Sequence, residues 1–157
     1  MNESYENLLE NFKEKKEKRK DFHKNSKILI VDGLNTFLRA FAVNPTRNKN
    51  GVHIGGIGGC LKSMGAAIKR FNPTRCIFDG KGGSKRRKQI FGDYKSGRSK
   101  GGYNRNYEFK DEDEDEAMKR QIVRTVDYLQ CLPVTLMSID HIEADDVIAY
   151  LCKQVYN

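Results

Sequence analysis

The sequence predicts an α/β domain built on a mostly parallel sheet that is flanked by helices. Short runs of apolar residues alternate along the chain with segments of helical periodicity, as in β-α-β units. Some of these runs are continuously apolar, which is typical of strands covered on both faces. With 157 residues and 38% hydrophobic content, the chain is long enough for one domain with a single sizeable core.

Residues 1–26 precede this pattern and differ from it in composition, with many helix formers and few core-building side chains. We interpret them as a basic helical or disordered extension. Lys13 to Lys20 suits a basic arm for nucleic acid, or a solvated helix stabilised by Glu and Lys four residues apart. A membrane-binding helix fits less well, because the apolar face would be thin.

The elements of the domain follow in order from residue 27 onward. The first strand is expected at Ile28–Val31, and residues 51–71 contain a crossover helix that ends before Asn72. Its expected buried positions are Ile54, Ile57, Leu61, Met64 and Ile68. The same segment holds four glycines that fit neither a dinucleotide fingerprint nor a P-loop. We expect close packing at Gly55, Gly56, Gly58 and Gly59.

The second strand is expected at Arg75–Phe78 and the third at Val134–Met137. A helix over Glu114–Gln130 should connect them. Its expected buried positions are Met118, Ile122, Val126 and Leu129. The acidic run Asp111 to Glu116 is expected to open this helix rather than bind metal.

Acidic side chains follow each of the three strands. Asp32 and Asp79 come directly after the first two, and Glu143, Asp145 and Asp146 open the helix after the third. In open parallel sheets the functional crevice lies at the carboxyl ends of the strands, so these carboxylates should converge there. They would repel one another unless a cation lies between them, and Mg²⁺ suits an all-oxygen site.

Each of these acids also has a purely structural interpretation. Asp-Gly pairs such as those at Asp32 and Asp79 are common in turns. Glu143 could close a capping box with Asp140 at the helix N-terminus. The joint placement of the acids at three strand ends favours the functional interpretation.

A basic cluster follows the second strand. Residues 81–105 contain nine Lys or Arg against a single acid, Asp93, while the whole chain has a net charge of +8. A basic cluster this dense suits binding to a phosphodiester backbone, and the aromatic residues interleaved in it suit base stacking. The alternatives are a solvated loop or a patch that neutralises the acidic run. The candidate substrate-binding residues of this cluster are Lys81, Lys88, Tyr94, Lys100 and Arg105.

The cysteines and the N-terminus bear on the compartment. The four cysteines, with no C-x-x-C pair, have apolar neighbours like small core residues, which favours a reducing environment. They are Cys60, Cys76, Cys131 and Cys152. No segment reads as a signal peptide or a membrane span. We expect a soluble cytoplasmic protein, in the host cytoplasm if the source is viral, without a membrane partner.

Four segments, IVDG, IFDG, FGDYKSGR and EADDVIAYL, resemble in this order the 5′-3′ exonuclease and flap endonuclease family of bacteriophages and bacterial polymerases. The resemblance covers roughly residues 27–155 and implies a PIN-like three-layer fold. It implies that Mg²⁺, or Mn²⁺ as a substitute, is held by Asp32, Asp79, Glu143, Asp145 and Asp146, with Asp32 also catalytic.

The resemblance also assigns roles in the basic cluster. Lys95 and Arg98 would be catalytic contacts of the scissile phosphate, with Arg87 a supporting contact. Residues 81–111 would form the basic loop of an arch around a 5′ single strand. The implied partners are DNA with a 5′ flap or a 5′ single-stranded end, and an RNA-DNA hybrid as a further candidate.

The family pattern continues beyond Asn157 with further acidic and duplex-binding elements, so the fold is expected to be incomplete at its C-terminus. The predicted function is therefore a metal-dependent 5′-3′ exonuclease or flap endonuclease that needs a C-terminal portion or a C-terminal nuclease subunit. The alternative is a DNA-binding or subunit-interaction module without catalysis.

Overall fold

A three-stranded parallel sheet with the order β1-β2-β3 lies at the centre of the protein. The computed structural model describes residues 27–79, 83–97, 103, 105–109 and 112–155. β1 spans Ile28–Asp32, β2 spans Arg75–Asp79 and β3 spans Thr135–Met137. The predicted α/β class is confirmed, and each strand begins and ends within one residue of its expected position.

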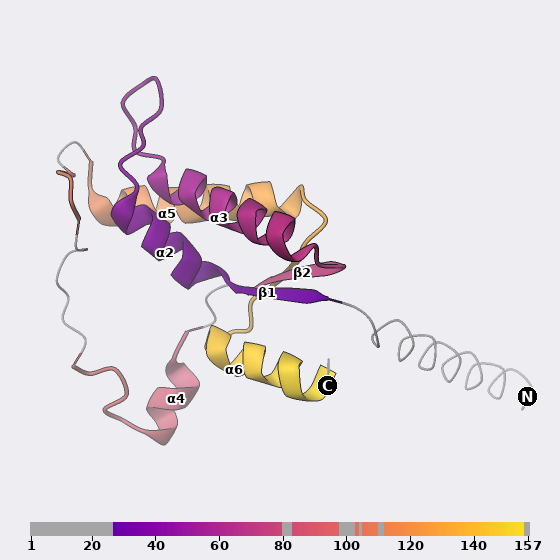
Figure 1. Ribbon diagram of the computed structural model, residues 1–157. Helices are drawn as coiled ribbons and strands as arrows, with labels where there is room; N and C mark the ends of the chain where they lie inside the picture. Colours follow the sequence, from indigo (N-terminus) through magenta and orange to yellow (C-terminus); the bar gives the residue numbers. More distant parts are fainter. Residues whose placement is uncertain (1–26, 80–82, 98–102, 104, 110–111, 156–157) are drawn as a thin grey trace, which may run out of the picture.

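Helices cover both faces of this sheet (Figure 1). Three helices lie on one face: α2 (Gly33–Val43), α3 (Gly55–Phe71) and α5 (Glu114–Gln130). On the other face lies α6 (Ala144–Tyr150), which continues as the π-helical turn η1 (Leu151–Val155). The short helix α4 (Lys85–Ile90) does not cover the sheet but lies away from it, on the side of the sheet plane where α6 lies (Figure 1).

The continuous apolar run of β1 is explained by a separate core on each face of the sheet. Leu29 and Val31 pack against the core under α2, α3 and α5, which contains Phe37, Phe41 and Cys60. Ile28 and Ile30 pack against a smaller core beneath α6, which contains Ile77, Val147 and Leu151. Because successive strand residues point to opposite faces, a strand between two helical layers needs apolar residues at every position.

Helix α2 was not expected from the sequence. It begins directly after β1, where the Asp32 carboxylate accepts a hydrogen bond from the Asn35 amide at 3.0 Å and caps the helix. Phe37 and Phe41 recur four residues apart on its buried face. The signal was present, but the sequence interpretation took the glycine-containing segment further along as the next element.

Close packing of glycines between α2 and α3 is confirmed at three of the four expected positions. A Cβ at Gly55 would meet the carbonyl oxygen of Asn44 at 1.8 Å, and one at Gly56 would meet the Phe37 ring at 2.7 Å. One at Gly59 would lie 2.7 Å from the Ala40 side chain. For Gly58 the expectation is wrong, because a Cβ there would meet open space.

The predicted buried face of α5 is confirmed at three of its four positions. The bounds Glu114–Gln130 are as expected, and Leu129 is fully buried, but Val126 is 37% exposed. The most buried positions of the helix also include the polar side chains of Gln121 and Thr125. Met118 and Ile122 are partly buried against the core, so the prediction is wrong only for Val126. Apolar periodicity did not indicate the two polar residues, which can lie in a core when they have partners. Ile68 of α3, also expected in the core, is similarly exposed.

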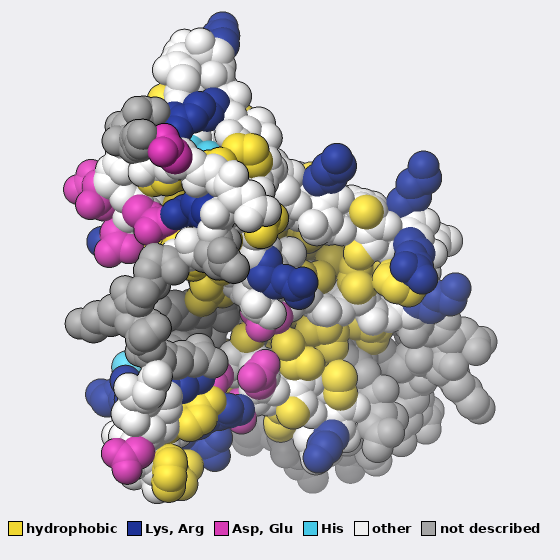
Figure 2. Space-filling model, turned by 60° about the vertical axis from the view of Figure 1, so that its left-hand side comes forward, with side chains coloured by type: hydrophobic (Ala, Val, Ile, Leu, Met, Phe, Trp, Pro, Cys, Tyr) yellow, Lys and Arg dark blue, Asp and Glu magenta, His cyan; other side chains and the backbone are white. Residues whose placement is uncertain are grey.

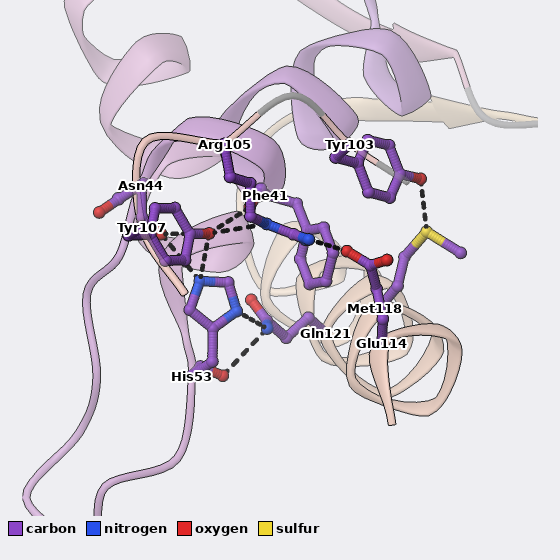
Figure 3. Close-up of polar contacts among 9 residues, drawn as sticks. All are labelled: Phe41, Asn44, His53, Tyr103, Arg105, Tyr107, Glu114, Met118 and Gln121. Carbon is purple, nitrogen blue, oxygen red and sulfur yellow. Dashed lines mark hydrogen bonds and ion pairs between the residues drawn. The ribbon is translucent and has the colours of Figure 1, made fainter. Parts of the chain in front are cut away.

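Gln121 is buried because it joins α5 to the start of α3. Its side-chain oxygen accepts hydrogen bonds from the amides of Gly56 at 2.9 Å and Ile57 at 3.2 Å. Helix α3 has no side-chain cap of its own, so this glutamine supplies one from another element. The Gln121 amide group donates to the His53 carbonyl at 2.9 Å and lies 3.1 Å from His53 Nδ1 (Figure 3).

His53 is 1% exposed, and its ring contacts indicate the neutral form. Nε2 lies 2.8 Å from the Asn44 carbonyl oxygen and can donate to it, while Nδ1 accepts from Gln121. Burial lowers the pKa of His53, although the hydrogen bond to Asn44 opposes this shift. Protonation of His53 at Nδ1 would therefore break the hydrogen bond that this nitrogen accepts from Gln121.

We expect the free energy of unfolding to decrease as the pH falls below about 6.5, the ordinary pKa of histidine. The unfolded chain then binds a proton that the folded chain, with the lowered pKa of His53, still excludes. Urea unfolding at pH 7.5 and 5.5 measures the effect. His53→Gln is the control and should flatten the dependence in this window. A dependence of equal size in this variant would contradict the assignment.

The cysteines divide into two pairs. Cys60 and Cys76 are buried in the core, as expected, but Cys131 and Cys152 are exposed, so the expectation is wrong for these two. All four thiols are free. Burial raises the pKa of Cys60 to about 11, which keeps that thiol protonated at neutral pH.

None of the helices in the described part of the chain is long and apolar enough to cross a membrane. The N-terminal extension, residues 1–26, lies outside the described residues. Its two interpretations, a basic arm and a solvated helix, therefore stay predictions.

Candidate active site

The candidate site lies at the carboxyl edge of the sheet, where the sequence predicted it. Asp32 and Asp79 end β1 and β2 and are paired in register, so their backbones are direct neighbours. Met137, which ends β3, is paired with Asp79. The segment that follows leads to Glu143 at the start of α6. Parallel alignment thus brings residues from distant parts of the sequence to one edge.

The predicted metal ligands at this edge differ in their surroundings. One oxygen of Asp32 caps α2, as described above, and Asp145 is exposed in the first turn of α6. For Asp79 the structure describes the backbone, and the side chain lies outside the described part. Among the described side chains, no group of three His, Cys, Asp or Glu residues is arranged to hold a metal ion.

Glu143 is the centre of a polar cluster with three residues of the basic segment. The Lys95 ammonium lies 2.5 Å from Glu143 Oε1, and the Tyr94 hydroxyl donates to Oε2 at 2.9 Å. Arg87 Nη1 is 3.2 Å from Oε2 and also donates to the Tyr94 hydroxyl at 2.6 Å. The Glu143 side chain is only 11% exposed, so these contacts shield it from water.

Arg87 makes a second, bidentate contact with Asp146. Its Nε and Nη2 atoms donate to the two carboxylate oxygens at 3.0 and 2.8 Å. Helix α4 carries Arg87, and its Arg86 amide donates to the His141 carbonyl at 3.2 Å, which fixes α4 near the start of α6. In Figure 2 basic and acidic side chains stand next to one another in the lower part of the molecule.

These contacts favour the charged form of both carboxylates. Burial works against ionisation of Glu143, but the hydrogen bonds from Lys95 and Tyr94 outweigh it and lower its pKa. Hydrogen bonds from Arg87 lower the pKa of Asp146 and raise that of Arg87 itself. Two acids and two cations therefore form a charge-balanced cluster at neutral pH.

The capping-box alternative for Glu143 is wrong. Glu143 occupies the N-cap position of α6, but its side chain makes no capping hydrogen bond. It points instead to Lys95 and Tyr94, about fifty residues away in the sequence. A local structural role thus does not explain this glutamate, whereas for Asp32 the helix-capping role is real.

The donor chemistry of the edge fits a hard divalent cation, because every candidate ligand offers carboxylate oxygen. Asp32 keeps one oxygen apart from its capping bond, and Asp145 makes no ion pair with any residue in the described ranges. Glu143 and Asp146 are engaged by Lys95 and Arg87, so a cation would have to replace or share these contacts. The set therefore fits the ion by chemistry.

Arg105 is placed differently from the prediction. Its side chain is 9% exposed and forms an ion pair with Glu114 (Figure 3). It lies among four aromatic rings, those of Phe41, Tyr103, Tyr107 and Phe109. Its guanidinium carbon is 4.7 Å from the ring centre of Phe109 and 5.2 Å from that of Phe41. Such a surrounding suits an anchor that fixes Tyr103 and residues 105–109 on α2 and α5. It does not suit the predicted contact with a substrate phosphate.

The acidic run behaves largely as expected. Asp113 caps α5 by accepting a hydrogen bond from the Glu116 amide at 2.9 Å, so the run opens this helix. Arg105 of the basic cluster forms an ion pair with Glu114 of the acidic run. For this one residue, the alternative interpretation that the basic cluster neutralises the acidic run is confirmed. Residues 110 and 111 lie outside the described part.

The remaining candidates of the basic cluster are only partly described. Lys88 is exposed on α4 and stays available for a phosphate contact. Tyr94, predicted to stack on bases, has both Arg87 and Lys95 near its ring, at 5.4 and 4.9 Å from the centroid. The predictions for Lys81, Arg98 and Lys100 fall outside the described residues.

Sequence reasoning missed two sets of partners. It did not pair Arg87 with Asp146, although it named both, and it did not foresee that Gln121 and His53 would anchor the loop between α2 and α3. Neither has a local signal, because the partners are 59 and 68 residues apart. Only an alignment of related sequences, through paired variation, could have indicated them.

Comparison with known sequences gives a family match. Residues 27–157 match the family described as "5′-3′ exonuclease, N-terminal resolvase-like domain". A 5′-3′ exonuclease of Bacillus subtilis (strain 168) is 37% identical over 81 residues, which cover 48% of this chain and 27% of that protein. A 5′-3′ exonuclease of Aquifex aeolicus (strain VF5) is 30% identical over 130 residues, which cover 81% of this chain and 40% of that protein. The chain thus spans less than half the length of these relatives.

Solved structures show the same fold. A bacteriophage T5 protein co-crystallised with metal ions matches with a TM-score of 0.54 and 22% identity, covering 82% of this chain and 44% of that one. A bacteriophage T5 flap endonuclease in a pseudo-enzyme-product complex with DNA and metal ions matches with a TM-score of 0.51 and 19% identity, and the coverage of the two chains is the same. At such identity the likeness concerns the fold, and it agrees with the three-layer arrangement described above.

Proposed function

The chain belongs to the family of 5′-3′ exonucleases with an N-terminal resolvase-like domain, and from this premise we propose that it forms the first part of a metal-dependent nuclease. The reaction is hydrolysis of phosphodiester bonds near the 5′ end of DNA, by exonuclease or flap endonuclease action. The match covers 40% of the Aquifex relative, and the proposal therefore includes a C-terminal portion or a C-terminal nuclease subunit that completes the activity.

The observation that carries this proposal is the meeting of acidic and basic groups at one edge of the sheet. Asp32 and Asp79 are neighbours in register, and Lys95 reaches Glu143 at the start of α6. A carboxylate edge beside a lysine and an arginine is what phosphodiester hydrolysis needs: anions for a divalent ion and cations for the phosphate.

The proposed roles follow from donor chemistry. Mg²⁺, with Mn²⁺ as a substitute, would be held by Asp32, Asp79, Glu143, Asp145 and Asp146. When bound, the ion polarises the phosphate and activates a water molecule. Lys95 and Arg98 donate hydrogen bonds to the phosphate oxygens on which negative charge grows during the reaction. Lys88 contacts another phosphate of the DNA backbone. No nucleophilic side chain is needed.

The proposed substrate is DNA with a 5′ flap or a 5′ single-stranded end. The net charge of +8 favours such a polyanion. The bacteriophage T5 flap endonuclease with a similar fold was crystallised in complex with DNA, which supports the same class of substrate. An RNA-DNA hybrid is a second substrate to test, because the phosphate contacts proposed here do not distinguish the sugars.

The direct test is cleavage of a labelled 5′-flap DNA in Mg²⁺, by the chain alone and with the C-terminal portion of a relative added as a separate polypeptide. We expect small 5′ products in at least one mixture. Asp145→Asn should lower the rate by about a hundredfold or more, because it removes a charged metal ligand. Asp127→Asn, a matched change on the exposed side of α5, should leave it unaltered.

Two results would decide against a nuclease. Cleavage that persists in Asp145→Asn would contradict the proposed metal site. DNA binding without cleavage in any mixture, at equal strength in Asp145→Asn, would instead indicate the alternative, a DNA-binding module without catalysis.

A further inference from the structure

The contact between Lys95 and Glu143 has a feature that the proposed function does not explain. Lys95 is the residue expected to meet the scissile phosphate, yet its ammonium lies 2.5 Å from a carboxylate that is expected to hold metal. Both oxygens of Glu143 are engaged, Oε1 by Lys95 and Oε2 by Tyr94 and Arg87. A cation that binds Glu143 must therefore displace one of these partners.

The three partners are not equally exchangeable. Arg87 is fixed by its bidentate contact with Asp146 and by the Tyr94 hydroxyl, and it would keep both if it lost Glu143. The Lys95 ammonium makes its one described hydrogen bond to Glu143 and otherwise lies near the Tyr94 ring. Lys95 is thus the partner that a cation can replace with the smallest loss of other contacts.

The backbone of Lys95 gives a second, independent observation. Its φ angle is +63°, in the left-handed region that non-glycine residues seldom adopt. The turn that contains it is closed by the Tyr94 amide to the Phe91 carbonyl and the Ser96 amide to the Asp93 carbonyl. Such a conformation persists where surrounding contacts compensate for it, and it is common at switch positions. Release of the ammonium would remove one of those contacts.

We propose that the Lys95 ammonium and a divalent cation are alternative partners of Glu143, so that ion binding moves Lys95 from the carboxylate to the substrate phosphate. The inference rests on the proposed function, because it takes Glu143 as a metal ligand. Simple charge repulsion supports it: an ion on Glu143 and an ammonium in contact with the same carboxylate repel each other. A phosphate next to the ion gives the ammonium a new anionic partner.

Calorimetric titration of the full chain with Mg²⁺, without DNA, tests the exchange. Lys95→Ala should bind Mg²⁺ more tightly than the unmodified chain, by about tenfold, the usual size of a coupling between two ligands. A merely structural role of Lys95 predicts the opposite sign. Unchanged or weaker binding in this variant would overturn the proposal.

Arg86→Ala is the matched control for charge acting at a distance. Arg86 precedes Arg87 on α4 and lowers the pKa of Asp146 through space, but its side chain forms no ion pair with any residue that the structure describes. We expect it to change Mg²⁺ affinity by about twofold or less. Equal tightening in Arg86→Ala and Lys95→Ala would mean that no direct exchange occurs.

Chemical reactivity supplies a second measurement that does not depend on any variant. The Lys95 side chain is 28% exposed while paired with Glu143, and exchange would free its amine. Acylation followed by mass spectrometry should show Lys95 more reactive in saturating Mg²⁺, relative to the exposed Lys85 of α4. Equal relative reactivity with and without Mg²⁺ would overturn the proposal.

The outcomes separate this inference from the proposed function. Tighter Mg²⁺ binding by Lys95→Ala, in a chain that never cleaves flap DNA, would support the exchange and remove the nuclease proposal. If Glu143→Gln bound Mg²⁺ as tightly as the unmodified chain, Glu143 would not be a ligand, and the exchange would fall even if cleavage were observed.

Discussion

Phe41→Ala is expected to lower the free energy of unfolding by about 3–5 kcal/mol, the usual cost of a large cavity in a core. Phe41 is fully buried and packs against three aromatic rings that lie outside its own helix. These rings are His53, Tyr103 and Phe109. The loss would therefore loosen α2 and, at the same time, the anchor of residues 105–109.

Urea unfolding followed by circular dichroism measures this effect. Phe91→Ala is the matched control, because Phe91 is 64% exposed after α4 and should change stability by less than about 0.5 kcal/mol. A loss below about 1 kcal/mol for Phe41→Ala would mean that the described core does not hold the domain together. If the variant is too unstable to purify, Phe41→Leu should show a smaller loss of the same sign.

Gln121→Leu is the second large effect. The replacement keeps approximate volume but leaves buried polar groups of the chain without partners, namely the amides of Gly56 and Ile57 and the carbonyl of His53. Each such group costs about 1–3 kcal/mol when it loses its hydrogen bond, so we expect a total loss of about 3–5 kcal/mol. On apolar periodicity alone, the same change would be judged stabilising.

The comparison with Gln130→Leu isolates the cause. Gln130 ends the same helix and is exposed, so its replacement removes the same amide without uncovering buried groups. It should change the free energy of unfolding by less than about 0.5 kcal/mol. Equal stability of the two variants would contradict the role of Gln121 as a cap of α3. Hydrogen exchange at the Gly56 and Ile57 amides should accelerate only in Gln121→Leu.

Much of the fold could be predicted because its signals are local. The continuous apolar run before Asp32 indicated a strand covered on both faces, and the two cores on β1 explain it. The bounds of α5 followed from its acidic start and its periodicity. The burial of Gln121 and Thr125 was not predicted, because a polar residue enters a core only when distant groups satisfy it.

The candidate site was predicted in outline and not in its contacts. That Asp32 and Asp79 meet at one edge follows from parallel pairing, which is a consequence of the order of strands and helices. That Lys95 pairs with Glu143, and that Arg105 lies inside among aromatic rings, does not. In the sequence the two cations belong to one basic cluster and look alike.

The sequence by itself determined the elements, their order and the types of residue that reach the carboxyl edge of the sheet, since hydrophobic periodicity and capping act over a few residues. Only the tertiary structure decided which charges are paired. A cation and an acid that are 48 residues apart, as Lys95 and Glu143 are, interact according to where packing brings them, and packing depends on all the layers together.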